Sequence, residues 1–184
     1  CKNIVADLLN FARQQEVLAQ ETDVHALLEK VVEGVRLQPI FKDVEIVRQF
    51  SPDLPIIQAD PAQLQQVFVN LLNNAAEAMQ EGGTITLATR PVNSQWVELK
   101  VSDTGRGIPE ENLGKLFTPF FTTKALGKGT GLGLSIVYGI IKMHRGQIAV
   151  RSQVGQGTTF TVTLPVQLPK GQLTSTSTLA DVIA

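Results

Sequence analysis

The sequence predicts an α+β fold, a two-layer α/β sandwich in which helices cover one face of a mixed, mostly antiparallel sheet. Amphipathic helical patterns alternate with short strand patterns, and consecutive strand patterns are arranged so that they can pair. The 184 residues are 43% hydrophobic and 18% charged, which suits a folded domain and excludes a disordered chain. A chain of this length buries enough apolar surface to need no disulfide. We therefore expect one main domain, preceded by a helical stub.

The first segment has the apolar spacing of an amphipathic helix, carried by Ile4, Val5, Leu8, Leu9 and Ala12. It begins abruptly at Cys1, as if cut within a helix, and its pattern runs to about Gln20. We therefore expect a fragment of a longer protein. In it, residues 1–20 form the helical stub, residues 21–168 form the main domain, and residues 169–184, with a Thr-Ser-Thr-Ser-Thr run, form a linker or disordered tail.

A helix and a strand are expected before residue 60. Thr22 and Asp23 offer caps for the start of the helix. Its predicted inner face carries Leu27, Leu28, Val31, Val32 and Val35. The segment from Val44 to Phe50 alternates apolar and polar residues except at Val47, which predicts a strand that Ser51-Pro52 ends.

The strongest helix signal lies between Asp60 and about Gln80. Asp60 suits the N-cap, Pro61 suits the first helical position, and Gly82-Gly83 stops the helix. The elements expected after it are strands over 84–92 and 96–102, an irregular stretch over 109–130, a helix over 132–144, and a hairpin of strands over 147–152 and 158–164.

Cysteine and membrane signals are nearly absent. Cys1 is the single cysteine, so the chain can make neither an internal disulfide nor a zinc site, and a reducing compartment is the default expectation. No run approaches 18 apolar residues. We expect a cytoplasmic domain, and leave open whether the full-length protein is anchored in a membrane.

Charge is distributed unevenly along the chain. Residues 1–111 contain 16 acidic and 9 basic residues, whereas residues 112–184 contain 7 basic residues and one acid, Asp181. A local positive field beside glycine-rich loops suits a polyphosphate better than a nucleic acid duplex, which would favour denser Lys and Arg. We therefore expect no nucleic acid partner. Chance variation among solvated strand edges is the alternative.

The helix from Asp60 to Gln80 carries a polar line formed by Gln66, Asn70, Asn74 and Glu77, at spacings of four, four and three residues. Asparagine is a poor helix former because its amide competes for backbone hydrogen bonds. Three asparagines within five residues are therefore unexpected in a helix that only faces solvent. The functional interpretation is that amide oxygens bind Mg²⁺, which prefers oxygen ligands. A solvated helix face remains the alternative.

A second motif, Asp103-Thr104-Gly105-Arg106-Gly107-Ile108-Pro109, follows a predicted strand directly. Its glycines allow the backbone to approach a flat ligand, and the carboxylate of Asp103 can accept a hydrogen bond from an exocyclic amine such as that of adenine. A plain Asx-turn is the alternative.

A third motif, Gly127-Lys128-Gly129-Thr130-Gly131-Leu132-Gly133-Leu134, leads into the last long helix. Each glycine carries a conformational cost of about 1 kcal/mol relative to alanine, so packing alone does not explain them. A glycine-rich turn at a helix N-terminus presents free N–H groups and the positive end of the helix dipole, which favours phosphate binding. The P-loop pattern is absent, and a dinucleotide-binding fingerprint does not fit because an irregular stretch, rather than a strand, precedes the motif.

The order of these motifs resembles that of the sensor histidine kinases. Asn-Leu-Leu-Asn-Asn-Ala at 70–75, the Asp103 motif, Phe-Thr-Pro-Phe-Phe-Thr-Thr-Lys at 117–124, Gly-Thr-Gly-Leu-Gly-Leu-Ser-Ile at 129–136 and Gly-Gln-Gly-Thr-Thr-Phe at 155–160 resemble the family's N, G1, F, G2 and G3 boxes. The resemblance covers about residues 22–166. It implies the ATPase fold shared with gyrase, MutL and large heat-shock chaperones, and is strongest for nitrogen-regulation kinases.

The resemblance implies ATP and Mg²⁺ as cofactors and suggests roles by position. Asn74 resembles the Mg²⁺ ligand and Asn70 its phosphate and metal-water partner. Asp103 resembles the residue that reads the adenine amine. Gly107 and Ile108 resemble the floor of the adenine pocket, and Thr158 resembles a second, partly water-mediated adenine contact. Gly105 is a further expected nucleotide-binding residue.

Residues 112–130 resemble the family's mobile ATP lid. Lys124 and Lys128 are candidate phosphate ligands there. Many histidine kinases have a lysine three residues after the Mg²⁺ ligand, whereas this chain has Glu77, so a lid lysine would have to replace it. The other expected nucleotide contacts in and after the lid are Thr123, Gly129, Thr130, Gly131, Leu132, Gly133 and Leu134.

Asn70 distinguishes a kinase from a hydrolytic ATPase. Gyrase-like ATPases have a glutamate here that activates water, whereas an amide has no useful basicity near neutral pH. The resemblance therefore implies transfer of the γ-phosphoryl to a histidine. The alternatives are a gyrase/MutL-type hydrolytic ATPase, a nucleotide-free regulatory module and, less favoured, an anti-sigma serine kinase.

The acceptor histidine is not expected in this chain. His25 lacks the acidic residue that follows the acceptor in the family, and His144 lies at a helix end, so both are interpreted as surface or packing histidines. The stub resembles the end of the second dimerisation helix, and the acceptor helix would precede it. The implied partners are the protein's own dimerisation helices in a homodimer and the receiver domain of a response regulator.

Overall fold

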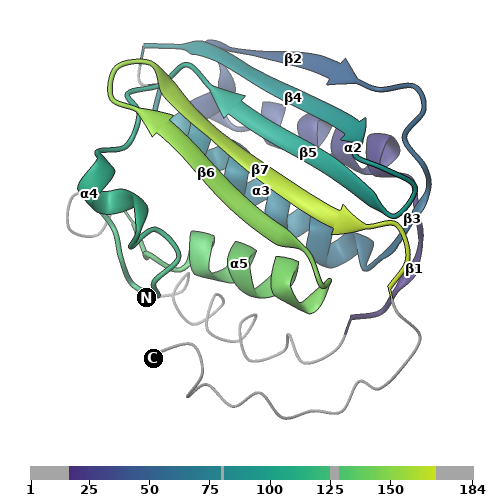
Figure 1. Cartoon of the computed structure of the whole chain (residues 1–184). Helices are drawn as coiled ribbons and strands as arrows, with labels where there is room; N and C mark the ends of the chain where they lie inside the picture. The colour runs from purple at the N-terminus through teal and green to yellow at the C-terminus, as the bar shows by residue number, and fades with distance from the viewer. Residues whose placement is uncertain (1–16, 80, 125–128, 169–184) are drawn as a thin grey trace.

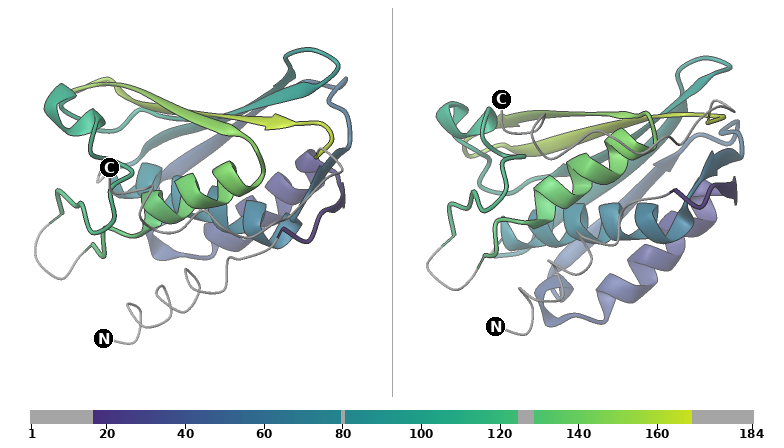
Figure 2. Two further views of the ribbon diagram at one scale, coloured as in Figure 1. Left: turned by 60° about the horizontal axis from the view of Figure 1, so that its bottom comes forward. Right: turned by 90° about the horizontal axis from the view of Figure 1, so that it is seen from below.

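The computed structural model describes residues 17–79, 81–124 and 129–168 as a two-layer arrangement of a sheet and helices. The main sheet contains β2 (Val44–Phe50), β4 (Gly83–Pro91), β5 (Trp96–Asp103), β7 (Gly157–Pro165) and β6 (Gln147–Gln153), in that order. β2 runs parallel to β4, and the other neighbours are antiparallel. Figure 2 shows the helices on one face of this sheet. The predicted α+β sandwich is confirmed.

Three helices form the second layer: α2 (Val24–Arg36), α3 (Pro61–Glu77) and α5 (Gly133–Met143). The apolar stripe predicted for α2 is buried, and so are the apolar stripes of α3 and α5. These stripes and the inward-facing residues of β4, β5 and β7 form one continuous core. Burial of each such aliphatic side chain stabilises the fold by about 1.5–3 kcal/mol relative to exposure.

Helix capping follows the sequence signals. The Asp23 side chain accepts hydrogen bonds from the backbone N–H groups of His25 and Ala26, and Asp60 accepts from those of Ala62 and Gln63. The α3 helix ends at Glu77, with Ala78 as its C-cap, earlier than the predicted end near Gln80.

Two short strands were not predicted. β1 (Gln20–Thr22) pairs antiparallel with β3 (Ile57–Ala59) as a separate two-stranded sheet. The helix expected up to about Gln20 is therefore wrong at its end: residues 17–19 have no regular structure and Gln20 begins β1. Pairing with β3 supplies the backbone hydrogen bonds that a helix would otherwise have made. Residues 1–16 of the expected stub and the predicted tail over 169–184 lie outside the described residues.

The other differences are also short elements. A 3₁₀ turn covers Pro39–Phe41, and α4 (Glu110–Leu113) lies within the stretch predicted as irregular. Among the described residues, no helix combines the length and apolar character needed to cross a bilayer.

Both histidines of the chain are packing residues in this structure. His144 is buried; its Nδ1 donates to the Ile140 carbonyl and its Nε2 accepts from the Asp60 N–H. Burial lowers the pKa of His144, which favours the neutral ring that these two bonds require. His25 stacks on Phe50, with ring centroids 4.7 Å apart, and contacts the Thr89 hydroxyl.

Candidate functional site

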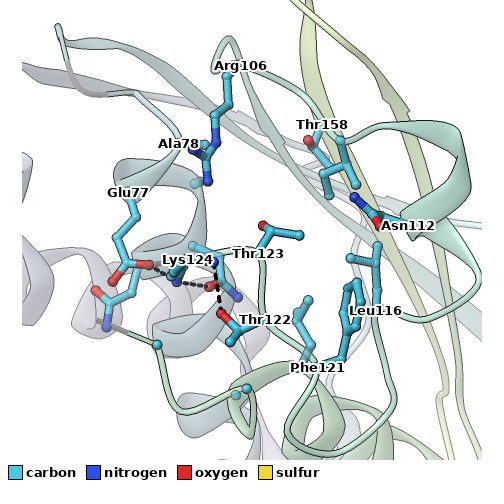
Figure 3. Close-up of a pocket in the computed structure, with 18 of the residues that line it drawn as sticks. Glu77, Ala78, Arg106, Asn112, Leu116, Phe121, Thr122, Thr123, Lys124 and Thr158 are labelled. Atoms are coloured by element: carbon cyan, nitrogen blue, oxygen red, sulfur yellow. Dashed lines mark hydrogen bonds and ion pairs between the residues drawn. The ribbon is translucent and has the colours of Figure 1, made fainter. Parts of the chain in front are cut away.

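A cavity of about 800 Å³ lies between α3, the end of β5, the segment after α4 and the start of α5. This volume is within the range of small-molecule sites, about 300–1,000 Å³. Figure 3 shows Glu77 and Lys124 on one side of the cavity and Thr158 and Asn112 on the other. The expected site residues that line it are Asn70, Asn74, Asp103, Gly107, Ile108, Thr123, Lys124, Gly129, Thr130, Gly131, Gly133, Leu134 and Thr158.

Asp103 ends β5 at one end of the cavity and is 9% exposed. Burial raises its pKa, while hydrogen bonds from the backbone of Gly105 and Thr158 act in the opposite direction. The Gly105 N–H donates to Asp103 Oδ1 at 2.8 Å. The carboxylate is therefore fixed in orientation at a wall where water is largely excluded, and its remaining lone pairs can accept a ligand's hydrogen bond.

A hydroxyl network holds the loop after β5 against β6 and β7. Ser152 Oγ accepts from the Ile108 N–H at 2.8 Å, donates to the Gly157 carbonyl at 2.9 Å and lies 2.9 Å from Thr158 Oγ1. Ser152 was not predicted as a site residue; it does not line the cavity itself, and its hydrogen bonds reach the cavity residues Ile108 and Thr158. This network fixes the backbone that lines the cavity beside Asp103.

Gly107 adopts a φ of +70°, and a side chain there would overlap the backbone of Gln153. A glycine is required because the loop passes directly against the β6–β7 hairpin. The glycine-rich motif thus lets the loop pack closely, and the Ile108 side chain lines the cavity.

Two predicted residues do not line the cavity. Gly105 contacts Asp103 and Ala78 instead, and a Cβ at Gly105 would lie 2.8 Å from the Ala78 carbonyl oxygen. Leu132 is 4% exposed and belongs to the core, because the turn before α5 directs it inward. Gly105 supports the cavity through its bond to Asp103, and Leu132 supports it by anchoring the start of α5.

At the other end of the cavity, α3 presents Asn70, Asn73 and Asn74. The N-terminus of α5 faces them, since a Cβ at Gly133 would lie 3.7 Å from Asn70 Oδ1. The N-cap of α5, Leu132, makes no side-chain capping bond. The first-turn N–H groups of α5 and the positive end of its dipole can therefore receive an anion beside the asparagine amides.

Lys124 connects the segment before α5 to α3. Its Nζ forms an ion pair with Glu77 Oε2 and a hydrogen bond of 3.3 Å with Asn74 Oδ1. Lys128, the other predicted phosphate ligand, lies outside the described residues. A positive charge thus already rests against the amide oxygen predicted to bind Mg²⁺, which fits an oxygen site for a cation. Among the described residues, no group of three or more His, Cys, Asp or Glu side chains could hold a metal.

Sequence reasoning missed several residues of the cavity wall. Arg106 and Pro109 lie within the predicted Asp103 motif, and Asn73 lies within the asparagine cluster, so those motifs could have indicated them. Glu77 lies on the predicted polar line, Ala75 and Phe160 lie in two of the predicted boxes, and the predicted lid contains Asn112, Leu116, Phe121 and Thr122, although none of these was predicted as a nucleotide contact. Ala78 and Val154 reach the wall through tertiary packing.

Comparison with known families gives a match over the part of the chain that carries this cavity. The sequence model of the family described as "Histidine kinase-, DNA gyrase B-, and HSP90-like ATPase" matches residues 59–168. The sensor kinase CckA of Brucella abortus (strain 2308) is 43% identical over 180 residues, covering 89% of this chain. The chain spans less than half the length of the curated relatives it matches, 19% in the case of CckA.

Solved histidine kinases share the fold. The structure of full-length ShkA in complex with AMPPNP aligns with a TM-score of 0.79 and 30% identity, covering 89% of this chain and 35% of ShkA. The catalytic domain of the histidine kinase ThkA aligns with a TM-score of 0.72 and 31% identity, covering 81% of this chain and 96% of that domain. ThkA in complex with the response regulator protein TrrA aligns with a TM-score of 0.75 and 28% identity, covering 90% of this chain and 47% of that kinase.

Proposed function

The chain belongs to the histidine kinase-, DNA gyrase B- and HSP90-like ATPase family, and we propose that it is the catalytic ATP-binding domain through which a sensor kinase phosphorylates a histidine. One observation carries this proposal: a single cavity combines a buried carboxylate at one end with amides, a lysine and a helix N-terminus at the other. Such a cavity matches the two chemically different ends of ATP.

We assign the adenine end of the cavity to Asp103, Gly107, Ile108 and Thr158. Asp103 would accept a hydrogen bond from the adenine amine, and Ile108 would contact the flat face of the base. A guanine presents a carbonyl where adenine has the amine, so it would leave the buried carboxylate facing another acceptor. Discrimination against guanine follows from that unpaired group.

We assign the phosphate end to Asn70, Asn74, Lys124 and the turn from Gly129 to Leu134, whose N–H groups precede or begin α5. Asn74 would be the protein ligand of Mg²⁺, and Asn70 would contact phosphate or a metal-bound water. When bound, the metal would neutralise charge on the phosphates. Lys124 and the α5 N-terminus would hold the γ-phosphoryl group for transfer.

The proposed reaction is transfer to an imidazole of the preceding helix in the full-length protein. A ring nitrogen forms the N–P bond with its lone pair, the bond from the γ-phosphorus to the bridging oxygen breaks, and ADP leaves. Asn70 cannot deprotonate water, which disfavours hydrolysis. The chain's residues therefore position and stabilise the transferring group rather than supply a nucleophile.

The expected partners follow from this assignment. The acceptor helices would come from a homodimer, and the phosphorylated histidine would pass its phosphoryl group to a receiver-domain aspartate. The complex of ThkA with TrrA supports a response regulator as the partner type. The domain would operate in the cytoplasm, where ATP is available.

Phosphotransfer and hydrolysis can be measured side by side with γ-labelled ATP. A longer chain that includes the acceptor helix should acquire acid-labile label, whereas residues 1–184 alone should bind ATP without becoming labelled. Steady release of phosphate by the longer chain, with no acid-labile label at any time, would support the gyrase-like hydrolytic ATPase instead.

A further inference from the structure

We propose that Glu77 is a positioning residue that holds Lys124 against Asn74 in the absence of nucleotide and makes nucleotide binding depend on magnesium. Lys124 would leave Asn74 when magnesium is bound there and would then contact the phosphates. This inference rests on the proposed function, because it concerns the phosphate end of the same cavity.

Lys124 contacts both an acidic and an amide side chain of α3. Its ammonium group bridges Glu77 Oε2 and Asn74 Oδ1, two groups three residues apart on the cavity side of α3. Figure 3 shows the Lys124 side chain pointing toward Glu77 on α3. The lysine therefore occupies the position expected for the metal cation.

Two cations cannot share the Asn74 oxygen. A magnesium ion bound to Asn74 Oδ1 would lie within a few ångströms of the Lys124 ammonium, where like charges repel strongly. Lys124 must then move away from Asn74, and the nucleotide phosphates offer it a new negative partner beside the Glu77 carboxylate. Binding of magnesium at Asn74 would therefore displace the Lys124 ammonium group.

The segment around Lys124 is shaped to bring its side chain to α3. Thr122 Oγ1 accepts a hydrogen bond from the Lys124 N–H at 3.1 Å. A Cβ at Gly129 would lie 2.6 Å from Thr122 Oγ1 and 3.0 Å from Lys124 Cδ, so the returning chain passes directly over this turn. The Lys124 side chain is 30% exposed and that of Glu77 is 37% exposed, which leaves room for the ammonium group to move.

The pair also lies at a boundary between two cavities. A second cavity of about 670 Å³ is lined by Pro39, Met79 and neighbouring residues, and it shares Glu77, Arg106, Thr123 and Lys124 with the nucleotide cavity. Because Glu77 lines the nucleotide cavity next to Lys124, its negative charge can act on the bound phosphates.

The charge of Glu77 explains the dependence on magnesium. Once Lys124 turns to the phosphates, the Glu77 carboxylate is left beside a polyanion unless a metal cation lies between them. Without magnesium, the phosphates of the nucleotide therefore approach an Asn74 that is already bonded to Lys124 and a Glu77 carboxylate that repels them. With magnesium, the metal satisfies Asn74 and screens Glu77.

Calorimetric titration with ATP, in magnesium and in EDTA, tests the proposal on the whole chain. Glu77→Gln keeps the side-chain shape and removes the charge, so it should tighten metal-free ATP binding by about tenfold and change magnesium-ATP binding much less. The matched control is Glu81→Gln, because Glu81 is an exposed acid that lines neither cavity. It should change neither affinity.

A reversed pair provides a second test. Lys124→Gln should weaken magnesium-ATP binding by about tenfold, and Glu77→Lys combined with Lys124→Glu should recover most of that loss, because it restores the ion pair and supplies a lysine from α3. If Glu77→Gln leaves the ratio of the two affinities the same as in Glu81→Gln, the positioning role is wrong, although the proposed function stands. If the unaltered chain binds no ATP in either buffer, the proposed function itself fails.

Discussion

The adenine end of the cavity is attached to paired strands, whereas the phosphate end joins a helix to a loop by charged side chains. Asp103 and Thr158 face each other in the register of β5 and β7, and Ser152 ties their surroundings together with hydrogen bonds. Lys124, by contrast, is held by an ion pair to Glu77 and one longer hydrogen bond.

This difference separates two tasks. A buried polar group recognises a ligand selectively only if its geometry is fixed before binding, which the strands provide. A charged group that must change partners cannot be fixed in the same way, and partly exposed ion pairs contribute little to stability, about 0–1 kcal/mol. We infer that the sheet supplies base selectivity and that the loop supplies a response to the metal and the phosphates.

Two glycines offer the largest expected contrast. Gly157 has a φ of +114° in β7, and a side chain there would overlap the Asp103 carbonyl; Gly131 has a φ of +68°, and a side chain there would overlap the Phe120 backbone. Gly157→Ala should destabilise the whole fold by about 3 kcal/mol and lower the thermal midpoint by about 10 °C. Gly131→Ala should leave the midpoint within about 3 °C and weaken ATP binding.

Thermal unfolding with and without ATP measures both effects. If the thermal midpoint falls by a similar amount in both variants, the phosphate end is as much a part of the cooperative fold as the adenine end, and the proposed difference between the two ends is wrong.

The Asn74→Ala substitution should produce the next largest effect. It removes the proposed metal ligand and no contact to the base, so magnesium-ATP affinity should fall by about tenfold or more, while affinity in EDTA should change little. Calorimetry in the two buffers provides the comparison. An equal loss in both would mean that Asn74 contacts the nucleotide directly rather than through a metal.

The Asp103→Asn substitution should have the smallest effect on stability. Burial raises the pKa of Asp103 in the folded state. Once the pH exceeds the usual aspartate pKa of about 3.8, ionisation of Asp103 therefore favours the unfolded state. Wild-type stability relative to Asp103→Asn should fall as the pH rises from below that value through the raised folded pKa, and then remain constant. At pH 7 the variant should unfold at the same temperature or a few degrees higher.

Denaturation of both proteins from pH 3 to pH 7 tests the direction in which their stability difference changes with pH. A variant that becomes progressively less stable than wild type as the pH rises would indicate that the hydrogen bonds to Asp103 outweigh its burial.

The sequence was sufficient for the longer helices and strands, whose residues follow a periodic pattern. The apolar spacing of α2, α3 and α5 and the alternation in β2 and β4–β7 predicted those elements to within a few residues. β1 and β3 were missed because each has three residues and their paired residues lie 35 to 39 positions apart, so neither carries a periodic signal. The α3 helix ends before the predicted stop at Gly82-Gly83, because Ala78 already caps it.

The same distinction applies to the cavity. Asp103, Asn74 and the glycine-rich turn belong to contiguous motifs, which made them predictable. The Glu77–Lys124 pair joins residues 47 positions apart, and its one sequence signal is a glutamate at a position where many histidine kinases have a lysine. Ser152 was missed because a serine in an alternating strand is indistinguishable from any solvent-facing residue until its neighbours in space are known.

The most direct test of the account is equilibrium binding of ATP and GTP to the unaltered chain in magnesium, repeated with Asp103→Asn. We predict saturable ATP binding at one site, GTP binding weaker by about tenfold or more, and a smaller difference between the two nucleotides in the variant. Equal affinity for ATP and GTP in the unaltered chain, or the absence of saturable ATP binding, would contradict the assignment of this cavity as an adenine nucleotide site.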